Sequence, residues 1–277
     1  MSLLEALLLG LIQGLTEFLP VSSSAHLVFF QHLLGFKEPL LFFDVLVHLG
    51  TLAAVFVYFA GDLAHLIRDS IYAVSFAFRR KPWKEILEIA SYARWTLGLL
   101  VASIPTGLIG FLFKDWFESM FGSLRGVGIA LFGTTMILWL TRYFQRGERK
   151  IEKCGFLDYL TIGFFQGIAI TPGISRSGST IAAALFRGLE RETAFRFSFL
   201  LAIPAILGAG LLELRHGFEL SFSEWPAYGI GFVVSAISGY LSIFFLSAVM
   251  RKGKLHWFAL YTLLFGCAVL FSSRWFE

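Results

Sequence analysis

Residues 171–180, with the sequence TPGISRSGST, place an arginine and several hydroxyl side chains between two long apolar stretches. The guanidinium of Arg176 is a rigid fork of donors that suits an oxyanion such as phosphate. Ser175, Ser177 and Thr180 surround it after a Pro-Gly break, and a helix that begins here would add free backbone N–H groups. The stretch therefore predicts half of a phosphate-binding site.

A second polar group lies near the N-terminus, in the sequence QGLTEFLPVSSSAHL at residues 13–27. Gln13 and Glu17 are four residues apart and share one helical face. A carboxylate in hydrocarbon is costly, so Glu17 needs a cation nearby, which could be Arg176, a metal ion or a proton. His26 titrates near neutral pH and could protonate a leaving group or attack phosphorus. Together these residues suit phosphoryl transfer on an amphipathic substrate.

Purely structural roles are the alternatives. Glu17 and Arg176 could form an ion pair that only joins two segments. Serines in broken helices often cap backbone groups, which is an equally good account of Ser22, Ser24 and Ser179.

The histidines leave similar alternatives open. His26 could be bonded to a carbonyl group within the membrane. His48 follows Asp44 by one helical turn, and the pair could line a cavity or lie at a solvated helix end. We treat this pair as a weaker candidate.

The composition predicts an integral membrane protein, because 57% of the residues are apolar and 15% are charged, against about 45–50% and 25% in soluble domains. Residues 1–277 are expected to form a single membrane domain. The net charge of +4 comes from short connections between apolar segments, so we do not expect nucleic-acid binding. Cys154 and Cys267 lie far apart in sequence, without the spacing of a zinc site.

Six apolar segments have about the length of one bilayer crossing. They are 41–60, 95–113, 124–141, 195–212, 227–249 and 256–272. Two further apolar regions, 3–35 and 156–187, are interrupted by Pro, Ser and Gly and leave halves too short to cross. We expect an all-α polytopic membrane protein with six transmembrane helices and two re-entrant helical hairpins that share a polar cavity.

Lys and Arg in the connections predict the orientation. The connections 61–92, 142–153, 187–196 and 250–254 are basic and should be cytoplasmic, whereas 36–40, 113–125 and 213–226 carry few basic residues and should lie outside. The hairpin at 3–35 then enters from the outside and the hairpin at 156–187 from the inside. The two hairpins are expected to be inverted relative to each other.

An internal repeat supports this inversion. Residues 10–27 align with residues 163–180 at an offset of 153, and the identities include Gly10 with Gly163 and Ser22 with Ser175. We expect one repeat at about 1–141 and a second at about 156–272. In inverted repeats the functional site lies near the midplane where the repeats meet.

The two motifs resemble the signatures of the undecaprenyl-diphosphate phosphatase family, also called the bacitracin-resistance family. QGLTEFLPVSSSAHL is similar to the first signature and PGISRSGST to the second, at every fixed position. The resemblance extends over the whole chain in length and span pattern. It implies hydrolysis of undecaprenyl diphosphate to undecaprenyl phosphate and inorganic phosphate in the bacterial inner membrane, where it recycles the lipid carrier of wall synthesis.

The resemblance also implies roles for particular residues. Carried onto this chain, the catalytic positions are Glu17, Ser23, His26 and Arg176, and the substrate-binding positions are Gln13, Ser175, Arg176, Ser177 and Thr180. Family members need a divalent cation, Mg²⁺ or Ca²⁺, for which Glu17 is the expected ligand. Gln13 departs from the glutamate of many members, so a cage of two carboxylates is in doubt and the metal is expected to bridge Glu17 and the substrate phosphates.

Several questions stay open at this stage. The nucleophile could be His26, Ser23 or a water molecule near Glu17. The site is expected to open to the periplasmic side, because Glu17 and His26 belong to the outer hairpin. Inverted repeats with broken helices are also typical of transporters, so a carrier or flippase of prenyl phosphate lipids is the alternative function. Besides its lipid partners, the chain could form a homodimer.

Overall fold

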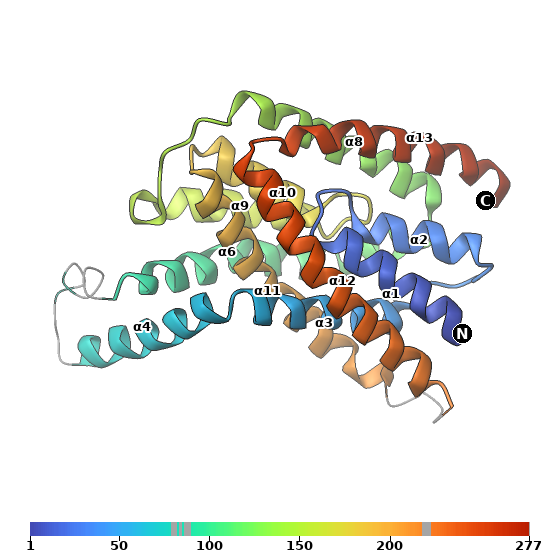
Figure 1. Cartoon of the computed structure of the whole chain (residues 1–277), viewed down its shortest axis with the longest axis horizontal. Coiled ribbons are helices and arrows are strands. Elements are labelled where there is room, and N and C mark those ends of the chain that lie inside the picture. The colour runs from blue at the N-terminus through green and yellow to red at the C-terminus, as the bar shows by residue number, and fades with distance from the viewer. Residues whose placement is uncertain (79–81, 83–84, 86–89, 218–222, 277) are drawn as a thin grey trace.

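The computed structural model describes residues 1–78, 82, 85, 90–217 and 223–276. These residues form α-helices, three short 3-10 helices and one isolated bridge between Arg149 and Leu189, and no strand is found among them. The predicted all-α class is therefore confirmed. In Figure 1 most of the helices run along the long axis of the molecule, as expected for a bundle that crosses a bilayer.

Within the described residues, six helices are long and apolar enough to cross a membrane, which confirms the predicted number of spans. They are α3 (Leu41–Tyr58), α6 (Tyr92–Leu112), α8 (Leu124–Leu140), α11 (Arg191–Gly217), α12 (Trp225–Arg251) and α13 (Phe258–Phe276). Each overlaps one predicted apolar segment. Large apolar side chains such as Phe111, Leu211 and Phe271 are exposed on them, which is typical of surfaces that face lipid.

The two interrupted regions form pairs of short helices. The first pair is α1 (Leu3–Glu17) and α2 (Ser23–Leu33), and the second is α9 (Phe156–Ile168) and α10 (Arg176–Phe186). The longest of these helices has 15 residues, fewer than the roughly 20 that a crossing needs. The structure is compatible with re-entrant hairpins, which remain a prediction.

The helix partners of the two hairpins correspond to each other. α1 packs against α12, and α9 packs against α6. A Cβ atom on Gly10 would lie 2.6 Å from the carbonyl oxygen of Gly231, and one on Gly163 would lie 2.0 Å from that of Ala102. Both glycines therefore permit backbone contact that no other residue allows. This correspondence is compatible with the predicted inverted repeat.

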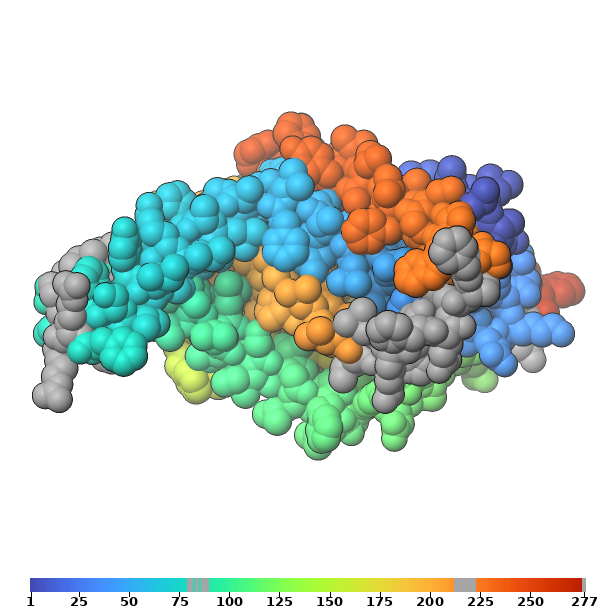
Figure 2. Space-filling model, turned by 90° about the horizontal axis from the view of Figure 1, so that it is seen from below, coloured from blue at the N-terminus to red at the C-terminus, as the bar shows by residue number. Residues whose placement is uncertain are grey.

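Two helices lie in stretches that the sequence analysis treated as connections. α4 (Ala60–Phe78) falls in 61–92, and α7 (Lys114–Phe121) falls in 113–125. α4 continues the direction of α3 and forms the left end of the molecule in Figures 1 and 2. Its charged first half lowers its hydropathy. The carboxylate of Asp69 accepts a hydrogen bond from the backbone N–H of Tyr92, and Asp62 pairs with Arg196.

Three of the basic connections meet at one end of the molecule. Arg149 donates to the carbonyl oxygen of Arg187, and Arg191 donates to those of Gln145 and Arg251. Both chain termini lie at the opposite end (Figure 1). This separation is compatible with the predicted orientation, which stays a prediction. Among the residues used for that prediction, Arg79, Arg80, Lys81, Lys84 and Glu219 lie outside the described residues.

A buried carboxylate fastens the second hairpin at this basic end. Asp158, at the start of α9, accepts hydrogen bonds from Arg149 and from Nε of Arg187 at 2.6 Å. The hydrogen bond to Asp158 raises the pKa of Arg149. Burial raises the pKa of the nearby Cys154 thiol to about 11, so this thiol is protonated at neutral pH and is a poor nucleophile.

Candidate active site

Glu17 and Arg176 form a buried ion pair between the two hairpins. Glu17 is the last residue of α1 and Arg176 is the first residue of α10. A terminal nitrogen of Arg176 donates to Oε1 of Glu17 at 2.7 Å, and their side chains are 15% and 5% exposed. The structure thus brings together two sequence motifs whose contact was only an expectation.

The second oxygen of Glu17 has three further partners. Ser23 Oγ donates to Oε2 at 2.6 Å, and Gln13 Nε2 donates to the same atom at 3.0 Å. Nε2 of His48, on α3, lies 3.3 Å from Oε2. Both oxygens of the carboxylate therefore have partners, which fix its orientation before any ligand binds.

The start of α10 is arranged as an anion-binding helix end. Ser175 is the N-cap, with backbone φ and ψ of −71° and 121°, and its hydroxyl accepts from the backbone N–H of Gly178 at 3.1 Å. Ser177 Oγ lies 3.4 Å from Ser175 Oγ. Arg176 supplies a positive charge at a helix N-terminus, where the peptide dipoles already favour an anion.

Thr180 connects α10 to α11. Its hydroxyl donates to the carbonyl oxygen of Arg176 and shares a 2.6 Å hydrogen bond with Ser198 Oγ. Arg176 also lies 3.5 Å from the carbonyl oxygen of Ser198 through its other terminal nitrogen. Thr180 thus contacts the backbone of Arg176 and the hydroxyl of Ser198, the residue whose carbonyl oxygen lies next to the guanidinium. Its role in this structure is to position Arg176.

The turns of the two hairpins are linked by hydroxyl groups. Ser22 Oγ accepts from the backbone N–H of Gly173 at 3.2 Å. Thr134, on α8, accepts from the N–H of Ser175 and donates to the carbonyl oxygen of Gly173. Gly173 has a φ of +100°, and a Cβ there would lie 2.5 Å from the carbonyl oxygen of Val127, so only glycine fits.

Ser22 is strained at this junction. Its φ of 67° is the only positive value of a non-glycine residue in the described chain. Such a conformation costs about 1–3 kcal/mol and is usually found at functional sites. Ser22 is also the N-cap of α2. Ser23, the next residue, is the first residue of α2, and its hydroxyl donates to Glu17.

The hydrogen-bond partners of His26 are Ser22 and Tyr261, and neither is Glu17 or Arg176. Its Nδ1 is 2.7 Å from the carbonyl oxygen of Ser22, and its Nε2 is 2.8 Å from the hydroxyl of Tyr261. Its ring stacks on Phe265 of α13 at 4.0 Å between centroids. A carbonyl only accepts, so Nδ1 carries the hydrogen and Nε2 accepts from Tyr261. Both ring nitrogens are thus occupied in this conformation.

The sequence analysis gave little weight to some residues that contact this site. His48 was a weaker candidate, and its helical spacing from Asp44 was the only signal for it. Asp44 itself accepts from Gln31 Nε2 at 2.6 Å and does not contact Glu17. Ser198 and Thr134 were not identified, because single hydroxyl residues in apolar helices carry no local pattern.

The donor set can be compared with the needs of Mg²⁺ or Ca²⁺. No group of three His, Cys, Asp or Glu side chains suited to a metal occurs in the described part of the chain. However, Oε1 of the fully buried Gln13 has no hydrogen-bond partner, and it belongs to the same cluster as the Glu17 carboxylate. Carboxylate and amide oxygens are ligands of these cations, and substrate phosphates commonly complete such a site. The residues therefore fit a divalent cation.

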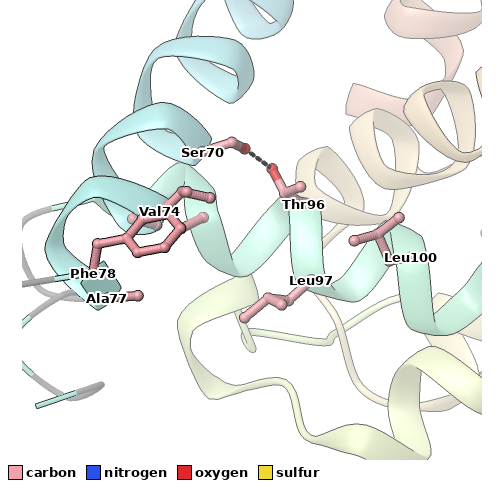
Figure 3. A pocket seen from close by; sticks show the side chains of 9 residues that line it. Ser70, Val74, Ala77, Phe78, Thr96, Leu97 and Leu100 are labelled. Atoms are coloured by element: carbon pink, nitrogen blue, oxygen red, sulfur yellow. Dashed lines mark hydrogen bonds between the residues drawn. The ribbon is translucent and has the colours of Figure 1, made fainter. Parts of the chain in front are cut away.

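Two surface grooves contain none of these residues. One, with a volume of about 470 Å³, lies between α4 and α6 and is lined by Val74, Phe78, Leu97 and Leu100 among others (Figure 3). A hydrogen bond between Ser70 and Thr96 crosses it. The other lies between α8 and α13. Both are mainly apolar, and the polar cluster around Glu17 is the arrangement that could perform chemistry.

Similarity to known proteins extends over almost the whole chain. Residues 6–268 match the family described as bacitracin resistance protein BacA. An undecaprenyl-diphosphatase of Carboxydothermus hydrogenoformans is 44% identical over 274 residues, which cover 98% of this chain and 97% of that protein. One of Alkaliphilus metalliredigens is 42% identical over 276 residues, covering 99% of each chain. One of Methanobrevibacter smithii is 40% identical over 274 residues, covering 99% of this chain and 98% of that protein.

Proposed function

The chain belongs to the bacitracin resistance protein BacA family, and on that premise we propose that it hydrolyses undecaprenyl diphosphate to undecaprenyl phosphate and inorganic phosphate. The observation that carries the proposal is the contact between Arg176 of one hairpin and Glu17 of the other. The relatives that share almost its full length are named undecaprenyl-diphosphatases. The six apolar helices make the chain a multi-pass membrane protein, in which a lipid substrate reaches the site from the bilayer.

Arg176 and the start of α10 hold the diphosphate. The terminal nitrogen that contacts Glu17 leaves other guanidinium donors for phosphate oxygens. Backbone N–H groups and the hydroxyls of Ser175 and Ser177 lie at the same helix end. Donors fixed in this way stabilise the charge on the equatorial oxygens in the transition state.

The best placed nucleophile is an oxygen next to Glu17. Ser23 Oγ already donates to the carboxylate at 2.6 Å, which is the relationship between a nucleophile and its base. Attack by water on the terminal phosphorus releases inorganic phosphate and undecaprenyl phosphate in one step. Attack by Ser23 releases undecaprenyl phosphate and leaves the phosphoryl group on Oγ, and a water molecule must then cleave this ester to release inorganic phosphate. In either case the proton of the nucleophile passes to Glu17. Ser23 or a water molecule in its place fits this role. His26 would have to leave Tyr261 first.

A divalent cation completes the proposed site. Glu17 and the unpaired Oε1 of Gln13 would hold it, together with the substrate phosphates. When bound, such an ion neutralises negative charge on the diphosphate. Gln13 is neutral, so the ligand set carries a single negative charge. The substrate phosphates are then the main attraction for the ion.

Phosphate release in detergent tests this function and separates it from transport. We expect purified protein to release phosphate from a long-chain prenyl diphosphate with Mg²⁺ or Ca²⁺, and to stop when a chelator is added. A transporter releases none in detergent. Absence of release from well-folded protein would therefore overturn the proposed enzyme, and release that persists with chelator would overturn its metal dependence alone.

We place the protein in the bacterial inner membrane, with its site open to the periplasm. The basic connections support this orientation. Lys37 is exposed between α2 and α3, and Lys252 is exposed after α12. In a variant that lacks Cys154 and Cys267, an impermeant thiol reagent applied to intact cells should label Lys37→Cys and not Lys252→Cys. The reverse pattern would place the site at the cytoplasm.

A further inference from the structure

His48 presents one ring nitrogen to the Glu17 carboxylate. Its Nδ1 lies 2.6 Å from the backbone carbonyl oxygen of Asp44, which can only accept, so Nδ1 carries a hydrogen. In the neutral ring, Nε2 then has a lone pair directed to the cluster. That atom lies 3.3 Å from Oε2 of Glu17. These two electron-rich atoms need a positive species between or beside them, and it is either a proton on Nε2 or a metal ion.

The separation of these two atoms suits a shared metal ion. Charge-assisted hydrogen bonds between nitrogen and a carboxylate are about 2.7–2.9 Å long, which is shorter than the 3.3 Å found here. Two ligands that each lie about 2.1 Å from one ion are about 3.0 Å apart at a right angle and about 3.4 Å apart at the tetrahedral angle. The observed distance falls within this interval.

Gln13 supplies an independent observation. Its side chain is fully buried, its Nε2 donates to Oε2 of Glu17, and its Oε1 has no partner. A buried oxygen without a hydrogen-bond partner destabilises the folded protein. A cation next to Glu17 would remove this destabilisation, because an amide oxygen is a suitable ligand.

The surroundings of His48 are compatible with those of a ligand histidine, although His26 and His32 make the same contact between Nδ1 and a backbone carbonyl. Metal-binding histidines usually donate their second ring N–H to a carboxylate or a backbone carbonyl, and His48 does so to Asp44. Its side chain is 26% exposed, so an ion can reach it. His26 differs, because Tyr261 already occupies its Nε2.

We propose that Nε2 of His48 is a ligand of the divalent cation held by Glu17, so that the site has mixed nitrogen and oxygen donors. Mn²⁺ shares the preference of Mg²⁺ for carboxylate and carbonyl oxygens, so it can serve as the paramagnetic probe of this site. The inference rests on the metal dependence in the proposed function and adds the nitrogen ligand.

Electron spin echo spectroscopy of bound Mn²⁺ tests the ligand directly. The sample is purified full-length protein with Mn²⁺ and inorganic phosphate, prepared with natural and with ¹⁵N-labelled histidine. We expect one imidazole nitrogen coupled to the ion in the wild type. His48→Gln should remove this coupling and weaken Mn²⁺ binding by about 10- to 100-fold. His65→Gln is the matched control, since His65 stacks on Tyr92 outside the site, and it should retain the coupling.

Four results would overturn the proposal. They are Mn²⁺ that binds without imidazole coupling, coupling that persists in His48→Gln, binding that is unchanged in Glu17→Gln, and absence of Mn²⁺ binding. Phosphate release is measured on the same samples with Mg²⁺. If release continues while the imidazole coupling is absent, the proposal about His48 fails and the proposed function stands.

Discussion

Arg176 donates to Glu17 over 2.7 Å, although the two residues are 159 positions apart in the chain. Glu17 is the last residue of α1 and Arg176 is the first residue of α10, so each lies next to the turn of its hairpin. The pair therefore joins the two hairpins and leaves both charges beside the same helix N-terminus. Its energetic contribution and its role in catalysis can be measured separately.

Substitutions of Glu17 and Arg176 should have strongly non-additive effects on the free energy of unfolding. Removal of one partner leaves a buried charge alone and costs about 3–5 kcal/mol, whereas replacement of both is often close to neutral. We expect Arg176→Met to lower thermal stability more than the double variant Glu17→Gln with Arg176→Met. Unfolding of the four proteins in one detergent gives the coupling energy. Additive losses would show that the charges do not interact.

Ser23 and Ser24 offer a matched comparison of adjacent hydroxyls. Ser23 donates to Glu17, whereas Ser24 contacts Ser22 Oγ at 3.2 Å. Ser23→Ala should reduce kcat for phosphate release by at least about 100-fold if the hydroxyl is the nucleophile. Ser24→Ala should stay within a few-fold of the wild type. Equal effects of the two substitutions would remove Ser23 from the proposed mechanism.

His26 and Tyr261 distinguish catalysis by the histidine from a structural role. The Tyr261 hydroxyl donates to Nε2 of His26. If His26 turns to the phosphate during the reaction, Tyr261→Phe should leave kcat unchanged or raise it, while His26→Gln should lower it by about 10²–10⁴-fold. If His26 only packs against α13, both variants should change thermal stability and leave kcat nearly unaltered in folded protein.

Thr134 should stabilise the junction of the hairpins. Thr134→Val keeps the shape of the side chain but removes the acceptor for Ser175 N–H and the donor for the Gly173 carbonyl. Each buried group left unpaired costs about 1–3 kcal/mol, so the melting temperature and phosphate release should both fall. Thr135→Val is the control, because Thr135 bonds Thr262 away from the turn. A larger loss in the control would contradict this account.

The sequence predicts the helices better than their contacts. The six spans follow from hydropathy alone, and Pro, Ser and Gly mark the breaks near Ser22 and Gly173. α4 was missed as a helix because its first half carries Asp62, Arg68 and Asp69. Those charges suggested a connection. In the structure, Asp69 and Asp62 have partners on α6 and α11, so the charged stretch can be helical.

The sequence predicted only those contacts of the site that a local pattern or a charge requires. Glu17 and Arg176 could be paired from the sequence, because a membrane charge requires a partner. His48 and Ser198 reach the cluster through the packing of α3 and α11, which no local pattern encodes. His26 belongs to the same motif as Glu17, yet the direction of α2 turns its ring to Tyr261.

The most direct measurement compares two arginines of the second hairpin. Arg176 contacts Glu17, and Arg187 contacts Asp158 at the other end of α10. We predict that Arg176→Ala abolishes phosphate release from a long-chain prenyl diphosphate in folded, purified protein, with a loss of at least about 10²-fold in kcat. Arg187→Ala should retain activity once folded. Full activity of Arg176→Ala would contradict the assignment of the phosphate site to the junction of the two hairpins.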